Sequence, residues 1–327
     1  MKMNLWVLIG VLSLPSASMS AAISPNGALG KAIKAYEADS GRSRFSHLKT
    51  IYALDASSLG ELKACAADDS INEHVRGACM VAIGRVMGAG SDEFFVPYLD
   101  RPRSQGSDGV KNTREESLRR QAAIEFGRSK SPKAIDYLKK SLSDPKWSDS
   151  VKDGSALGLA LSGDRSGVPH AIHSVITRSY SSDFSLNALI VLRDVSAIPK
   201  FEEAAKTADA SQADDLHRAI VRLQMAGKTP EERLGILSAA VDRDDVQFLF
   251  REWAVIQMAE VRTPAAYRAI DKLCESPKKE TAQAANGTLS RILFRGGDEF
   301  DAKEIIAAIP DNKLIKYLTT GQKPPPK

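Results

Sequence analysis

Two histidines one helical turn apart are the residues of this chain whose spacing first suggests chemistry. His170 and His173 are three residues apart, so a helix would place both imidazoles near one face. A zinc site needs three or four ligands, and no set of cysteines or carboxylates nearby in the sequence completes one. We therefore predict that the pair binds no metal and that the protein uses no cofactor.

Other catalytic patterns are missing from the sequence. It contains neither a Gly-x-Ser-x-Gly nucleophile motif nor a glycine-rich loop that could cradle a phosphate. We therefore predict a protein that is not an enzyme, and we name no catalytic residue.

Two interpretations fit Cys65 and Cys79, a disulfide or two free thiols. Cys65 and Cys79 lie in consecutive predicted helices on either side of a polar turn, and antiparallel neighbours could bring their sulfurs within bonding distance. Two buried free thiols fit the same sequence, because cysteine is often buried as a small apolar residue. Cys274 lies near Ile270 and Leu273 in an amphipathic segment and is predicted to be buried.

A pattern that returns about every 34 residues must position these groups. A helix-sized segment ends near a small residue, a polar turn follows, and a second helix opens with an aliphatic residue that is often followed by proline. The second residues of these openings are separated by 39, 33, 30, 34 and 35 residues: Pro97, Asp136, Pro169, Pro199, Arg233 and Arg268. Such a period predicts stacked helical hairpins rather than one closed globule.

Capping signals mark many of the predicted helix starts. In four places a Ser or Thr precedes a Glu by three residues, as in a capping box: Ser58–Glu61, Ser70–Glu73, Thr113–Glu116 and Thr229–Glu232. Proline follows Ser131, Thr229 and Thr263, at the first helical position, where its missing N–H costs nothing. Helices are predicted along the whole mature chain, among them 59–67, 71–87, 92–99, 115–127 and 132–143, and no segment alternates like a β-strand.

Two segments resemble known repeats. The runs Leu118–Leu138 and Arg76–Arg85 resemble HEAT-type repeats, most of all the short bacterial variety first noted in phycobilin lyases. Weaker copies extend the resemblance over roughly residues 57–275. The resemblance implies an all-α fold, an α-solenoid of about eight stacked antiparallel helical hairpins over residues 23–320. Such repeats serve scaffolds, adaptors and inhibitors and only occasionally enzymes, so they say little about function.

In a HEAT-like stack the second helix of each hairpin lines the concave face, and equivalent residues line up across it. One such line carries Tyr98, Tyr137, His170 and Lys200, and another carries Arg101, Lys140 and His173. Tyrosines and cations there favour a protein partner that is acidic, although a merely solvated face fits the same residues. Apolar positions beside them are predicted to form the core: Val96, Ile135, Val168, Ile198, Leu99, Leu138 and Phe201.

A polar insertion at 100–113 interrupts the repeat and is a second candidate binding surface. It carries Arg101, Arg103 and Lys111 and lies beside the basic pair Arg119–Arg120. Long loops on rigid scaffolds often carry binding contacts. A tolerated surface insertion would show the same composition, so both interpretations stay open.

The two ends of the chain are expected to lie outside the fold. Residues 1–22 combine Lys2, an apolar run and small residues from Ser20 to Ala22, the pattern of a cleaved secretory signal peptide. This predicts a periplasmic protein, or alternatively a secreted one, with no integral membrane segment in the mature chain. The tail 321–327 is proline-rich and predicted to be disordered. The net charge of +4 is too small, in an exported chain, to favour nucleic acid.

These observations predict an exported, non-catalytic protein-binding solenoid that acts as a scaffold or adaptor through its concave face. A periplasmic inhibitor or immunity protein that neutralises an exported enzyme or toxin is the alternative within binding. A lyase-like HEAT enzyme is the alternative of another class. It would need an acid or base with a perturbed pKa in a small-molecule pocket.

Overall fold

The computed structural model describes residues 22–40, 43–101, 109–179, 181–295 and 301–320. Every regular element in these ranges is helical and none is a strand, which confirms the all-α prediction. Residues 1–21 of the predicted signal peptide 1–22, together with Arg103 and the proline-rich tail, lie outside the described residues. Within the described part of the chain, no helix is both long and apolar enough to cross a bilayer.

The stretch predicted as one domain divides into two compact units, with the boundary between Asp164 and Arg165. At this boundary Gly163 ends a helix in the left-handed conformation, with a φ of 87°, which glycine adopts more readily than other residues. We call the part up to Asp164 unit 1 and the part from Arg165 unit 2.

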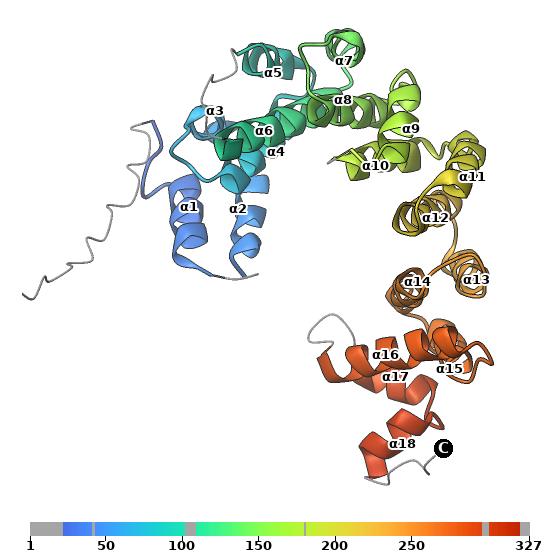
Figure 1. Cartoon of the computed structure of the whole chain (residues 1–327). Helices are drawn as coiled ribbons and strands as arrows, with labels where there is room; N and C mark the ends of the chain where they lie inside the picture. The colour runs from blue at the N-terminus through green and yellow to red at the C-terminus, as the bar shows by residue number, and fades with distance from the viewer. Residues whose placement is uncertain (1–21, 41–42, 102–108, 180, 296–300, 321–327) are drawn as a thin grey trace, which may run out of the picture. The chain divides into compact units, whose positions relative to one another are not determined.

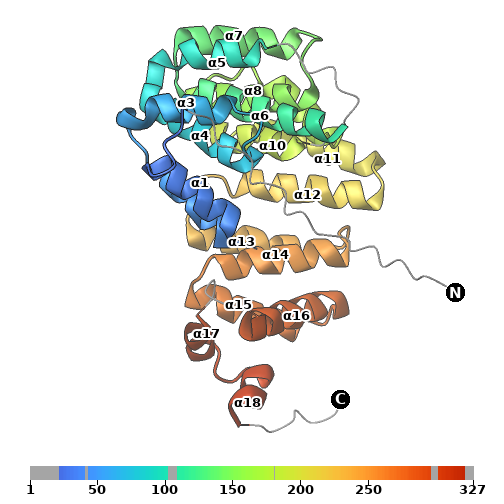
Figure 2. The ribbon, with the colours of Figure 1, turned by 90° about the vertical axis from the view of Figure 1, so that its left-hand side faces the viewer.

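Unit 1 is built from pairs of helices (Figures 1 and 2). Its α-helices are α1 (Ala28–Ala38), α2 (Leu48–Tyr52), α3 (Leu59–Ala67), α4 (Glu73–Met87), α5 (Asp92–Leu99), α6 (Gly109–Arg128), α7 (Pro132–Ser143) and α8 (Asp149–Ser162). Helices α4, α6 and α8 pack side by side in one layer. Helices α3, α5 and α7 pack on α4, α6 and α8 respectively and form a second layer.

Glycines let α6 and α8 touch backbone to backbone. A Cβ added to Gly127 would lie 2.3 Å from backbone atoms of Gly158, and a Cβ on Gly158 would lie 2.6 Å from the carbonyl oxygen of Ala123. No larger residue fits such a crossing without moving a helix. The two glycines therefore fix how closely the neighbouring pairs of helices approach in unit 1.

Aromatic side chains link the two layers of unit 1. The ring centroids of Phe95 and Phe126 are 6.0 Å apart, those of Phe126 and Tyr137 are 5.8 Å apart, and Trp147 follows at 6.4 Å from Tyr137. Contacts of this geometry add to the free energy gained from burial. This row of rings joins helices α5, α6 and α7 and the turn before α8.

The predicted core positions fall into two groups. Leu99, Leu138 and Phe201 are buried as predicted, each at most 1% exposed. Four others are only half-buried: Val96, Ile135, Val168 and Ile198. Val96 and Ile135 nevertheless pack against the buried core of unit 1. These four lie one helical turn before the buried position of their repeat, where the packing against the facing helix is less complete.

Unit 2 has the same two-layer construction, which Figure 1 shows edge-on. Its helices are α9 (Val168–Ile176), α10 (Ser182–Leu192), α11 (Ile198–Thr207), α12 (Ala210–Gln224), α13 (Pro230–Val241), α14 (Phe248–Glu260), α15 (Pro264–Cys274), α16 (Lys279–Arg295), α17 (Ala302–Ala308) and α18 (Lys313–Thr320). Helices α9, α11, α13 and α15 pack on α10, α12, α14 and α16 respectively. We call the layer of α10, α12, α14 and α16 the first-helix layer, because the sequence repeat makes each of them the first helix of a predicted hairpin.

Some predicted caps are confirmed and others are wrong. Thr229 and Glu232 form the predicted capping box, and Ser131 and Thr263 accept hydrogen bonds from the first turns of α7 and α15. The remaining three predicted boxes are absent: Ser58 makes no capping bond, Asn72 rather than Ser70 caps α4, and Thr113 lies inside α6. At α4, Asn72 lies directly before the helix and its side chain reaches the backbone N–H of His74.

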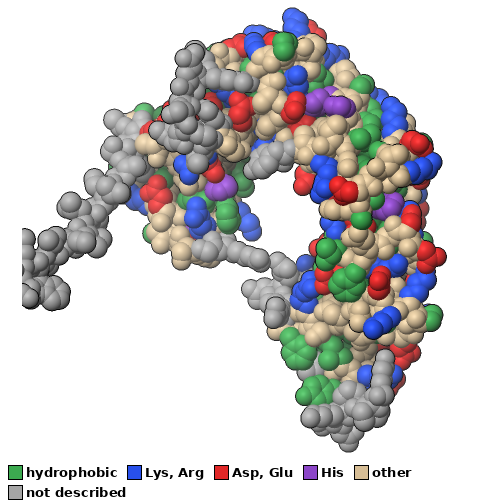
Figure 3. Space-filling view, viewed as in Figure 1, with side chains coloured by type: hydrophobic (Ala, Val, Ile, Leu, Met, Phe, Trp, Pro, Cys, Tyr) green, Lys and Arg blue, Asp and Glu red, His purple; other side chains and the backbone are tan. Residues whose placement is uncertain are grey.

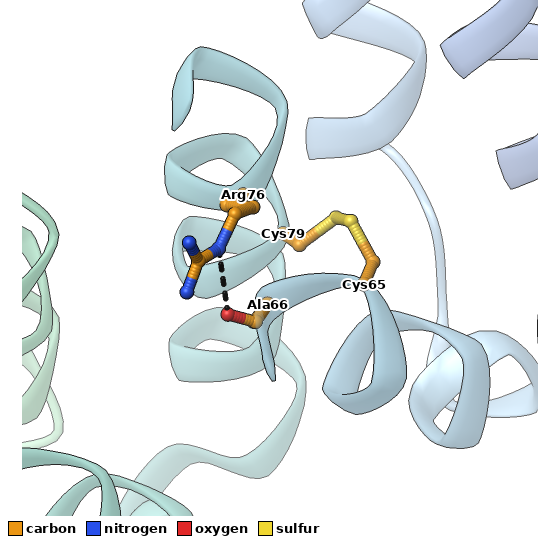
Figure 4. The surroundings of a disulfide bond; sticks show 4 residues. All are labelled: Cys65, Ala66, Arg76 and Cys79. Atoms are coloured by element: carbon orange, nitrogen blue, oxygen red, sulfur yellow. Dashed lines mark hydrogen bonds between the residues drawn. A yellow bond between two sulfur atoms is a disulfide. The ribbon is translucent and has the colours of Figure 1, made fainter. Parts of the chain in front are cut away.

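A disulfide joins Cys65 and Cys79, so α3 and α4 are covalently linked (Figure 4). Their Cα atoms are 6.5 Å apart, and both cysteines are fully buried. The alternative of two free thiols is therefore excluded in this structure. Cys274 is free and only half-buried, and desolvation raises the pKa of its thiol to about 12.

Buried arginines bind the open carbonyl ends of preceding helices. Arg76 donates from Nε to the carbonyl oxygen of Ala66 at 3.1 Å, beside the disulfide (Figure 4). Arg119 donates to the carbonyl oxygens of Leu99 at 3.0 Å and Arg101 at 2.7 Å. Arg251 binds the end of α13 in the same way. These contacts satisfy helix C-terminal carbonyls that have no partner within their own helix.

Candidate functional site

The predicted strip of tyrosines and cations divides between the two units. Tyr98, Arg101, Tyr137 and Lys140 belong to α5, α7 and the turn after α5 in unit 1. His170, His173 and Lys200 belong to α9 and α11 in unit 2. Arg103 lies outside the described residues.

Tyr98 is not a surface residue, contrary to the prediction. It is 1% exposed, and its hydroxyl accepts a hydrogen bond from Arg76 Nη2 at 3.4 Å. The guanidinium of Arg101 covers the ring at 4.8 Å from its centroid. Desolvation raises the pKa of this phenol to about 12. Tyr98 therefore belongs to the core of unit 1.

Tyr137 is half-buried, and its hydroxyl donates to Asp100 Oδ1 at 2.8 Å. Burial, with this carboxylate beside it, raises the pKa of the phenol. Its ring also belongs to the aromatic row of unit 1. Most of this tyrosine is thus committed to internal contacts, and only its edge can meet a partner.

The remaining predicted site residues are more accessible. Lys140, His173, Lys200 and Arg101 are exposed, and His170 is half-buried. Among the described residues, no group of three or more His, Cys, Asp or Glu side chains is arranged to hold a metal ion.

The predicted basic surface beside the insertion is smaller than expected. Arg119 is only 2% exposed and serves the end of α5, which corrects its placement on the surface. Arg120 is half-buried and donates to Ser150 Oγ at 2.8 Å. The charge of Arg119 is therefore used inside the unit and is not offered to a partner.

One buried acid has the perturbed pKa that an enzyme would need. Burial raises the pKa of Glu125, which is 1% exposed in α6. Its carboxylate accepts hydrogen bonds from Arg128 Nε at 3.0 Å and Gln121 Nε2 at 2.9 Å, both on the same helix. Gly84 of α4 packs against it, which places the acid in the contact between α4 and α6. Its surroundings are those of a structural ion pair.

A cavity of about 440 Å³ in unit 2 gathers charged groups that the sequence did not single out. We call it the arginine pocket. Its charged and aromatic lining comes from the turn after α9 and from α10, α12 and α14: Arg178, Asp183, Asp215, Arg218, Arg222 and Trp253. Val175, Leu186 and Ala219 form an apolar wall. The volume is that of a small-molecule or side-chain pocket.

Helix α12 presents its polar stripe to the pocket. Asp215, Arg218 and Arg222 are spaced by three and four residues, so they lie on one helix face. All three are half-buried, while Leu216, Ile220 and Leu223 on other faces of the same helix are buried. Burial of the apolar face in the core fixes the orientation of α12, so its polar face points into the pocket.

Arg178 reaches the pocket from an unusual backbone position. It follows the end of α9 with a φ of 52°, in the left-handed region that favours glycine. Its guanidinium meets Asp215 Oδ2 at 2.5 Å and lies 3.5 Å from Ser211 Oγ. An arginine thus ends the helix where glycine would be less strained.

Two carboxylates hold the three arginines: Asp215 on α12 and Asp183 on α10. Asp215 lies between two of them, because Arg218 Nη1 approaches its other oxygen at 3.4 Å. Arg222 donates to Asp183 at 3.2 Å and to Asn187 at 2.9 Å. Three cations against two carboxylates leave the pocket with a local excess of one positive charge.

Trp253 forms the aromatic side of the pocket. Its ring is half-buried, and the guanidinium carbon of Arg218 lies 6.0 Å from its centroid. Arg218 also donates to the carbonyl oxygen of Leu249 at 3.3 Å, and its Nε is buried without a hydrogen-bond acceptor in the described part of the chain. The pocket thus combines arginines with a half-buried tryptophan ring, and both residue types are enriched at binding hot spots.

The sequence contains a partial signal for this site. Arg218 and Arg222 are one turn apart in a predicted first helix, whereas the predicted strip of tyrosines and cations belongs to second helices. The surface over α9 to α14 that Figure 3 shows carries Lys and Arg side chains close to Asp and Glu rather than a broad area of one sign. Composition therefore could not reveal the pocket.

No protein-family model matches this chain, and a comparison with curated proteins finds no similar sequence. The resemblance to HEAT-type repeats therefore stays a prediction.

Proposed function

We propose that this is an exported, non-catalytic protein-binding α-solenoid of the periplasm, whose binding surface includes the arginine pocket. The two-layer packing of helix pairs within each unit supports the solenoid. The signal-peptide pattern of residues 1–22 supports export. A scaffold or adaptor role fits a repeat protein whose surface carries binding groups.

One observation carries the proposal of binding: three arginines and a tryptophan line one cavity on the first-helix layer of unit 2. Arginine and tryptophan are enriched among the few residues that contribute most to binding at protein interfaces. Because the arginines come from the turn after α9 and from α12, and the tryptophan from α14, a folded unit holds them in place before a partner arrives. Such preorganisation lowers the entropy cost of binding.

A pull-down of the mature chain, residues 23–327, from envelope extract tests this proposal. The Arg178→Ala/Arg222→Ala variant should lose a partner that the wild type retains. A matched variant, Lys140→Ala/Lys200→Ala, removes the same charge from exposed positions of the predicted strip and should retain the partner.

Loss of the partner by the lysine variant alone would move the binding surface to the predicted strip. Failure of the wild type to retain any protein would contradict the proposal of a protein-binding function.

A further inference from the structure

Resting on this proposed function, we infer that the arginine pocket receives an acidic peptide segment. One carboxylate of the segment replaces Asp215 between Arg178 and Arg218, and an adjacent apolar side chain packs on Trp253. The recognised chemistry is a carboxylate next to an apolar group.

Asp215 shows which chemical group Arg178 and Arg218 bind. Its two oxygens contact Arg178 at 2.5 Å and Arg218 at 3.4 Å, so one carboxylate already bridges both guanidinium groups. The pairing is exposed to solvent, because the three side chains are 31–44% exposed. Ion pairs at such exposure contribute little to stability, so a ligand carboxylate can take this place at small cost. Asp215 thus acts as an internal competitor.

Arg222 supplies a second carboxylate-binding group on the same face. It lies one helical turn from Arg218, and its carboxylate partner Asp183 has a side chain that is 83% exposed. Alternate residues of an extended peptide point the same way and are about 7 Å apart, close to the separation of residues one turn apart on a helix. Two acidic residues at alternate positions therefore match the two arginines.

The apolar part of the pocket favours a peptide over a free anion. Trp253, Leu186 and Val175 line the cavity together with the arginines. A free phosphate fills only a small part of about 440 Å³ and leaves these apolar groups uncovered. A peptide with an aromatic residue before its acidic residues covers them, and the ring stacks on the edge of Trp253.

Trp253 also provides the measurement. The mature chain holds two tryptophans, Trp147 and Trp253, so Trp147→Phe leaves a single reporter at the pocket. The probe is an end-capped peptide with phenylalanine followed by two glutamates at alternate positions. Its glutamine analogue and inorganic phosphate are the controls. Each is titrated into the Trp147→Phe protein while Trp253 fluorescence is recorded.

We expect saturable binding of the glutamate peptide that weakens with added salt, and no response to the glutamine peptide. Arg218→Ala should weaken binding about tenfold or more, because a charge-assisted pair is lost. Asp215→Asn should strengthen binding several-fold, because it removes the competing carboxylate. Lys206→Ala, an exposed charge change on α11, should leave the affinity unchanged, and circular dichroism confirms that each variant is folded.

An equal response to phosphate and to the peptide would overturn the peptide assignment, and so would weaker binding by Asp215→Asn. Loss of the extract partner by Arg178→Ala/Arg222→Ala, without any peptide response, would leave the proposed function standing and refute this inference. Peptide binding without an extract partner would support this inference and contradict the proposed function.

Discussion

Buried arginines close the open ends of neighbouring helices in both units. Arg119 is the clearest case, because it holds two carbonyl oxygens at the end of α5 and also meets Glu115 at 3.2 Å. Its planar guanidinium holds several N–H donors in a fixed geometry, whereas the ammonium of lysine is a compact point charge on a flexible stem. The charge of Arg119 therefore stabilises the fold and does not contact a partner.

Arg119→Ala should lower the free energy of unfolding of unit 1 by about 2–4 kcal/mol, because one buried carbonyl, one part-buried carbonyl and a carboxylate lose their donor. Arg119→Lys should recover little of this loss. Arg114→Ala on the same helix is the matched control, since its side chain is 63% exposed and pairs with Glu73, and it should cost less than about 1 kcal/mol. Urea unfolding followed by Trp147 fluorescence measures all three. Equal losses for Arg114 and Arg119 would refute the structural role.

His217 makes part of the stability of unit 2 depend on pH. It is 7% exposed, its Nε2 lies 3.2 Å from Arg243 Nη2, and Asp245 is 3.8 Å away. Desolvation, and then the charge of Arg243, lower the pKa of this imidazole, although Asp245, Asp214 and Glu202 act in the opposite direction. The folded state therefore prefers the neutral ring.

The unfolded chain binds a proton at His217 near pH 6.5, before the folded chain does. The contribution of His217 to the free energy of unfolding is thus complete above about pH 6.5 and is lost as the pH falls toward the lowered pKa of the folded state. His217→Gln should flatten this dependence. Thermal unfolding of both proteins from pH 8 to pH 5 checks this expectation. A constant difference between their midpoints over that range would contradict it.

At the scale of elements, the close crossing of α6 and α8 depends on two glycines. Gly158→Ala should destabilise unit 1 by about 2 kcal/mol or more, because its Cβ would lie 2.6 Å from a backbone oxygen and the helices cannot shift independently. Gly77→Ala in α4 is the control, since a Cβ there meets nothing within 4 Å. It should stabilise the protein by up to about 1 kcal/mol through helix propensity. Denaturant midpoints distinguish the two, and a stabilised Gly158→Ala protein would contradict the packing.

Elements were predictable where local chemistry decides them. The predicted helices 59–67, 92–99 and 132–143 coincide with α3, α5 and α7, because hydrophobic spacing and nearby turn residues set these boundaries. The wrong caps arose where a side chain closer to the helix, such as Asn72, takes the bond.

The site was not predictable, because Arg178, Arg218 and Trp253 lie on separate elements and meet only through packing. Burial likewise separates Arg119 from Arg120, although the two are adjacent and chemically identical in the sequence. Local patterns carry no information on which of two such residues faces the core.

At the scale of the whole molecule, the repeat rhythm of the sequence runs past a boundary that the structure places between Asp164 and Arg165. Repeats of similar spacing occur on both sides, so period alone could not predict the division. The disulfide and Trp147 lie in unit 1, and Trp253 lies in unit 2. The two units therefore carry separate reporters.

Reduction of the disulfide should lower the stability of unit 1 by about 3 kcal/mol, the value for a closed loop of this size, since the cysteines are 14 residues apart. In single-tryptophan proteins, the reductant should shift the unfolding transition seen by Trp147 and leave the one seen by Trp253. The Cys65→Ser/Cys79→Ser variant should be insensitive to reductant. Equal shifts at both tryptophans would show that the units unfold as one.

The left-handed backbone of Arg178 has a consequence for protein engineering. A redesign guided by stability alone would replace this arginine with glycine, relieving about 1 kcal/mol of strain at the end of α9. The same exchange would delete one of the two guanidinium groups that share Asp215. A more heat-resistant version of the protein obtained in this way would then bind the proposed acidic peptide more weakly.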